Sequence, residues 1–93
     1  ETVFDKMTVQ NAADIAIANG TQIKNGVEVT TPSPVTITSE SNQVNKFQAP
    51  ATNQVTLIFN NSKASNVELK NISNLIVKNN SFISLNSQSL NPI

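Results

Sequence analysis

Few side chains in this sequence are suited to acid–base, nucleophilic or metal chemistry. The 93 residues include no His, no Cys and no Arg, and only six Lys and six Asp or Glu. Without His and Cys, the usual ligands of zinc, copper and haem are missing, so we expect no cofactor and no metal site. The one pair of acids whose spacing suits catalysis is Glu28 and Glu68, which are 40 residues apart.

The rest of the composition is polar and uncharged. Asn, Ser, Thr and Gln make up 40 of the 93 residues, and the formal net charge is zero. This balance gives no long-range field to attract nucleic acid or an anionic membrane, and no segment is long and apolar enough to span a bilayer. A Cys-free, Asn- and Thr-rich chain fits an extracellular, cell-surface or virion-surface location.

The sequence repeats with a period of 20 residues. Residues 9–23 align without gaps on residues 69–83, an offset of 60 that divides into three twenties. This predicts four coils, at residues 7–26, 27–46, 47–66 and 67–86, with flanks at 1–6 and 87–93. Four aligned columns are apolar throughout: Met7, Val27, Phe47 and Val67; Val9, Val29, Ala49 and Leu69; Ile15, Val35, Val55 and Leu75; Ile17, Ile37, Leu57 and Val77.

The apolar columns alternate with polar ones, as in short strands that bury one face. Each coil therefore has two strands, and we expect equivalent strands to stack in parallel around a shared core. A third, less buried wall is expected at the column formed by Val3, Ile23, Gln43, Lys63 and Ile83. Alternatively, that strand slips by one residue and buries Val44 and Ala64 instead.

The predicted fold is an all-β parallel β-solenoid, with a small antiparallel β-sandwich as the alternative. The strand ends at residues 7–11 (MTVQN), 15–19 (IAIAN), 67–71 (VELKN) and 75–79 (LIVKN) resemble right-handed parallel β-helices. Such helices occur in filamentous-haemagglutinin-like adhesins, autotransporter passengers, phage tailspikes and pectate-lyase-like enzymes. The Gly-rich signatures of adhesin repeats are absent, so the resemblance supports the architecture without selecting one family.

Glu28 and Glu68 share one outward column, two coils apart. Carboxylates so placed would be about 9.6 Å apart, near the upper limit for an inverting glycosidase. Gln48 lies between them, and we expect no aromatic platform for sugar rings and no groove-forming insertion. The two acids are therefore predicted to be solvated charges that prevent lateral sheet association, or weak glycan contacts, and the protein is predicted not to be an enzyme.

Asn residues follow the strands, where their tolerance of left-handed backbone favours turns. The turn positions are expected at Asn11, Asn19, Asn25, Asn61, Asn71, Asn79 and Asn86. Four glycosylation sequons begin at Asn19, Asn60, Asn71 and Asn79, and all four are expected in outward turns, open to modification in a glycosylating host.

These features predict a structural or adhesive surface module. It would be a rigid rod segment of a cell-surface protein, filament or phage fibre that contacts other chains, a glycan or a host-surface receptor. The alternative is a fragment of a polysaccharide-binding or depolymerising β-helix enzyme. Unpaired strand edges at both ends predict self-association or continuation of the solenoid.

Overall fold

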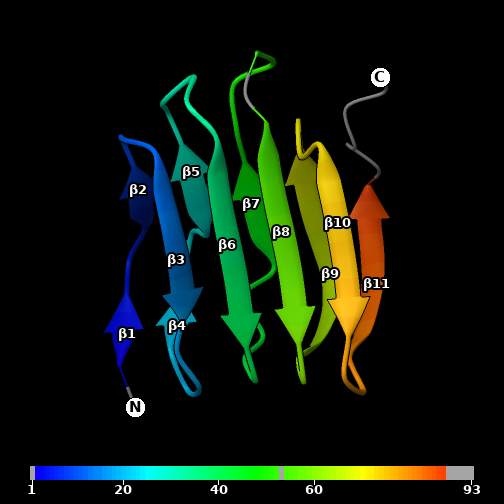
Figure 1. Ribbon diagram of the computed structural model, residues 1–93. Helices are drawn as coiled ribbons and strands as arrows, with labels where there is room; N and C mark the ends of the chain where they lie inside the picture. Colours follow the sequence, from blue (N-terminus) through cyan, green and yellow to red (C-terminus); the bar gives the residue numbers. More distant parts are fainter. Residues whose placement is uncertain (1, 53, 88–93) are drawn as a thin grey trace.

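The protein is a parallel β-solenoid. The computed structural model describes residues 2–52 and 54–87, and within them it has eleven strands and no helix. Every strand pair is parallel, and successive coils stack side by side along one axis (Figure 1). The solenoid prediction is confirmed, and the antiparallel sandwich is excluded.

The coils have three walls. The first wall is a five-stranded sheet of β2 (Met7–Val9), β5 (Val27–Val29), β7 (Lys46–Gln48), β9 (Lys63–Lys70) and β11 (Phe82–Ser87). The second wall is a four-stranded sheet of β3 (Ala13–Ile17), β6 (Val35–Glu40), β8 (Val55–Asn60) and β10 (Asn74–Lys78). The third wall is shorter and contains β1 (Val3–Phe4), β4 (Gln22–Ile23), residues 42–44 and the first halves of β9 and β11.

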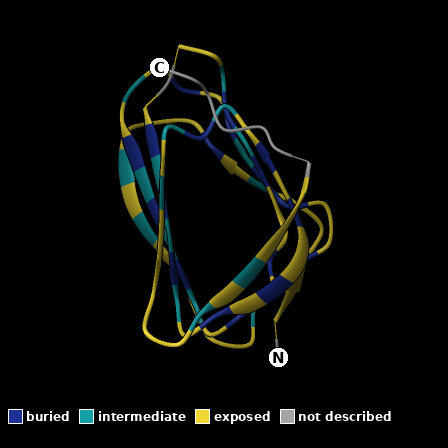
Figure 2. Cartoon of the chain, turned by 90° about the vertical axis from the view of Figure 1, so that its right-hand side faces the viewer, coloured by how far each residue is buried: buried dark blue, intermediate teal, exposed yellow. Residues whose placement is uncertain are grey.

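One apolar core runs through the stack. Buried and exposed residues alternate along β6 and β8, and the view along the stack shows this alternation (Figure 2). Phe47 and Phe59 meet edge to face in the interior, with ring centroids 5.8 Å apart. Of the sixteen residues predicted to point inward, Val77 is the exception, because it is 44% exposed at the last second-wall strand.

The repeat is exact over three coils but not over each one. In the second wall Ile37 pairs with Leu57 at the predicted spacing of 20, whereas Ile15 pairs with Ile37 at 22 and Leu57 with Leu75 at 18. The differences cancel over the three steps, so Ile15 and Leu75 keep the offset of 60. The predicted pairing of Ile15 with Val35 is therefore wrong.

A similar shift occurs in the first wall. Met7, Val27 and Phe47 stack at the predicted spacing of 20. Phe47 then pairs with Leu69 rather than with Val67, because the third coil takes up two more residues before it returns to this wall. Val67 still points inward and is fully buried.

The third wall combines both sequence interpretations. Ile23, Val44 and Ala64 are buried, and Ile83 packs partly buried against the same core. Ile83 pairs with Ala64, so the slip by one residue is confirmed in the middle of the stack.

The corner between the second and third walls uses left-handed backbone. Positive φ angles occur there at Gly20 (82°), Ser41 (49°), Asn61 (52°), Asn79 (54°) and Asn80 (62°). Asn71, at the end of β9, has φ 59°. The predicted turn role of Asn61, Asn71 and Asn79 is therefore confirmed, since Asn and Gly tolerate this conformation best.

Two glycines allow a test of how tightly the coils stack. Gly26 (φ 78°) and Gly20 (φ 82°) both adopt left-handed backbone, where a side chain costs about 1–2 kcal/mol. A Cβ on Gly26 would overlap the Lys46 carbonyl oxygen and lie 2.6 Å from the Lys46 Cβ, whereas a Cβ on Gly20 meets nothing within 4 Å. We expect Gly20→Ala to lower the free energy of unfolding by about 1–2 kcal/mol, and Gly26→Ala by about 3 kcal/mol or more.

Urea unfolding of both variants measures the difference. Equal losses of stability would contradict the close approach of Gly26 to the next coil.

A buried polar cluster closes the same corner, and it consists of Ser39, Asn42 and Ser62. The Asn42 Nδ2 donates to the Ile17 carbonyl at 3.0 Å, across the coil boundary. The Ser62 hydroxyl donates to the Ser39 carbonyl at 2.8 Å. Each coil therefore satisfies backbone groups of its neighbour, which is what buried polar atoms require.

Candidate functional site

The candidate site is an outward row on the first wall. Thr8 pairs with Glu28, Glu28 with Gln48, and Gln48 with Lys70. Parallel strands lie about 4.8 Å apart, so a hydroxyl, a carboxylate, an amide and an ammonium group follow one another at that spacing. The strands position them because their inward neighbours Val27, Phe47 and Leu69 anchor the opposite face.

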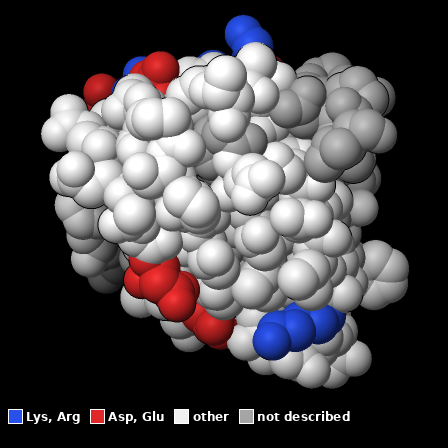
Figure 3. All heavy atoms as spheres, turned by 45° about the horizontal axis from the view of Figure 1, so that its top comes forward, with Lys and Arg blue, Asp and Glu red and all other residues white. Residues whose placement is uncertain are grey.

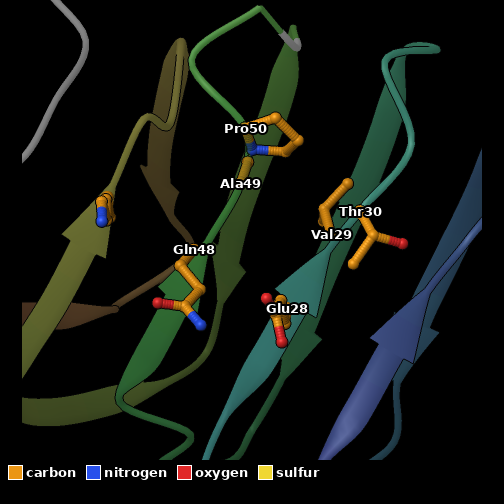
Figure 4. Close-up of a pocket in the computed structure, with 7 residues that line it drawn as sticks. Glu28, Val29, Thr30, Gln48, Ala49 and Pro50 are labelled. Atoms are coloured by element: carbon orange, nitrogen blue, oxygen red, sulfur yellow. The ribbon is translucent and has the colours of Figure 1, made fainter.

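The row borders a hollow of about 410 Å³. Its lining residues come from three successive coils and are Glu28, Val29, Thr30, Gln48, Ala49, Pro50 and Lys70. Figure 4 shows Glu28 and Gln48 side by side on neighbouring strands, with Thr30 and Pro50 at the turns that follow. The hollow is open and shallow, and its polar groups suit hydrogen bonding to a hydroxyl-rich molecule.

Glu28 is held by an ion pair. The Lys6 Nζ lies 2.6 Å from Glu28 Oε1, and both side chains are partly exposed (41% and 34%). Exposed pairs of this kind contribute little to stability. The pair does neutralise the carboxylate, which leaves Lys70 as the remaining charge on the described lining of this hollow.

The predicted alignment of Glu28 with Glu68 is wrong. Glu68 pairs with Lys46, and Lys70 takes the position opposite Gln48. Glu68 is thus two coils and two residues away from Glu28, a Cα separation of about 12 Å at ordinary strand spacing. This exceeds the separation of about 6.5–9.5 Å that an inverting acid pair requires, and the cause is the two extra residues before Leu69.

The sequons lie mainly in the corner described above. Asn19 is exposed, and Asn71 and Asn79 follow strands, but Asn60 is the last residue of β8 rather than a turn residue. The Asn60 Nδ2 donates to Glu40 Oε1 at 2.8 Å, and its Oδ1 accepts from the Asn79 Nδ2 at 2.6 Å. Two of the four amides therefore already serve the stacking of coils.

Asn71 is also engaged, because its Nδ2 donates to the Ala49 carbonyl at 3.0 Å. The Asn-Asn-Ser and Asn-Gly-Thr triplets are typical of the left-handed corner itself. In the Asn60 sequon the third residue, Ser62, is fully buried. The motif thus has a structural use whether or not it is modified.

Charge is sparse across the surface. On the face shown in Figure 3, charged side chains form small separate groups on a mostly uncharged surface. Among residues 2–52 and 54–87, no group of three acids could hold a metal ion. No helix in this part of the chain is long and apolar enough to cross a membrane.

The sequence-based reasoning expected no aromatic platform and missed Phe82. Its side chain is 75% exposed on β11, directly opposite Lys63. The signal was present: Phe82 stands one residue before the inward Ile83, so strand alternation alone points it outward.

No protein-family model, curated protein or solved structure matches this chain.

Proposed function

We propose that the protein is a structural or adhesive surface module, a rigid rod segment whose outward walls contact other chains or glycans. The observation that supports this best is the continuous core of stacked coils, in which each coil buries the apolar face of the next. Such a core makes a stiff scaffold with regularly spaced outward side chains. Its extracellular or virion-surface location is part of the proposal.

Further strands on the outer edges of β10 and β11 are also part of the proposal. No described strand pairs with either edge, and large apolar side chains are exposed nearby at Ile76, Val77 and Leu85. Unpaired edges of this kind accept additional parallel strands. These strands would come from the same chain or from another copy.

The alternative, a polysaccharide-depolymerising β-helix, has less support. Its only acid candidates, Glu28 and Glu68, lie in different rows, and Glu28 is paired with Lys6. The described loops between the first and second walls are short, so they build no deep groove. Acid–base cleavage of a glycosidic bond needs two cooperating carboxyl groups.

A retention assay separates the two functions. The purified protein is incubated with insoluble polysaccharides and intact cell surfaces, and bound protein and released reducing ends are measured in the same samples. We expect retention without release, and the same result for the double variant Glu28→Gln/Glu68→Gln. Its melting temperature should stay within a few degrees, because exposed charges contribute little.

Two outcomes would count against the proposal. Release of reducing ends by the wild-type protein, lost in a folded double variant, would establish the enzyme alternative. Absence of retention on every surface would remove the adhesive role and leave only the scaffold.

A further inference from the structure

The outward side of the third wall carries a second row of side chains. Its members are Gln22, Gln43, Lys63 and Phe82, one from each successive coil, and all four are exposed. Lys63 and Phe82 are direct strand partners. The next residue along the chain in each coil points into the core, so the row is fixed in orientation although its strands are short.

Two adjoining hollows follow this row. The first, of about 180 Å³, is lined by Gln22, Lys24 and Gln43 together with Thr21, Ile23 and Val44. The second, of about 440 Å³, is lined by Gln43, Lys63 and Phe82 together with Ala64, Ser65, Ile83 and Ser84. Because both include Gln43, they form one strip along the stacking axis.

The chemistry of the strip differs from that of the Glu28 row. Phe82 offers an exposed aromatic face, Gln22 and Gln43 offer amides that donate and accept hydrogen bonds, and Lys24 and Lys63 offer positive charge. No acid is among the described residues that line either hollow. The strip therefore favours a ligand that combines an apolar ring face, hydroxyl groups and negative charge.

We propose that this strip binds an acidic glycan. One sugar ring packs its apolar face on Phe82, ring hydroxyls bond to Gln43 and Gln22, and a carboxylate or sulfate of the glycan pairs with Lys63. The four side chains span about 14 Å at ordinary strand spacing, which suits an extended oligosaccharide along the axis. Two lysines supply too few phosphate contacts for nucleic acid. The proposal rests on the adhesive function above and names its ligand.

Titration calorimetry with three oligosaccharides of equal length tests the site: one with uronic-acid carboxylates, one sulfated and one neutral. We expect the wild-type protein to bind an acidic probe more tightly than the neutral one, and more weakly as salt rises. The comparison of carboxylate with sulfate identifies the anionic group. Phe82→Ala should weaken binding about tenfold, as loss of a central aromatic contact does. Lys63→Gln should weaken acidic probes several-fold and leave the neutral probe unchanged.

Two matched variants control for general effects. Leu85→Ala removes another exposed apolar side chain from β11, and Lys78→Gln removes an exposed lysine from the second wall. Neither residue lines the strip, so both should bind as the wild type does. Thermal melts establish that all four variants are folded.

The inference is overturned if the wild-type protein binds neither acidic probe, or if Phe82→Ala binds as Leu85→Ala does. A preference for the neutral probe would also overturn it. Retention of the Phe82→Ala variant on surfaces that hold the wild type would leave the adhesive function standing and place the contact on another wall.

Discussion

Replacement of Leu57 by Asp is expected to abolish folding, while the same replacement at Thr56 is expected to be tolerated. Leu57 is fully buried in the middle of β8, between Ile37 and Leu75 of the adjacent coils. An unpaired carboxylate in a dry core costs several kcal/mol, which is comparable to the whole stability of a small domain, about 5–15 kcal/mol. Thr56 points outward from the same strand, where a charge stays solvated.

Circular dichroism melts of the two variants measure this difference. A cooperative transition near the wild-type temperature for Thr56→Asp, with none for Leu57→Asp, is the expected result. Similar melts for both variants would show that β8 does not bury the face assigned to it.

Asn42→Ala is expected to have the second largest effect. The Asn42 Oδ1 accepts from the Ser39 hydroxyl and from the Val44 amide, and its Nδ2 donates to the Ile17 carbonyl. Removal of the side chain leaves these groups buried without that partner, and each unsatisfied group costs about 1–3 kcal/mol. We expect a loss of about 3 kcal/mol, which lowers the melting temperature by more than about 10 °C in a domain of this size.

Asn45→Ala provides the matched control. Asn45 is the same residue type three positions along the chain, but it is exposed, and exposed substitutions usually change stability by less than about 0.5 kcal/mol. If the two variants melt together, the buried corner network does not stabilise the stack as described.

The sequence by itself determined which residues face the core. Alternation of apolar and polar residues identified Val27, Phe47, Val35 and Leu57 as inward, because a strand exposes every second side chain to the same side. Asn residues at strand ends identified left-handed turns for a local reason, the low steric penalty of that backbone for Asn. Both signals depend only on neighbouring residues, so no tertiary information was needed.

Only the tertiary structure decided which residues of different coils meet. Coil lengths of 22, 20 and 18 residues in the second wall sum to the same 60 as three equal coils, so the sequence offset could not distinguish them. The corner loops absorb the differences, and the hydrogen bonds between strands then fix the register. That register placed Lys70 rather than Glu68 beside Gln48, and it placed Phe82 beside Lys63. Function on a solenoid surface depends on such neighbours, because adjacent outward side chains come from residues about 20 positions apart.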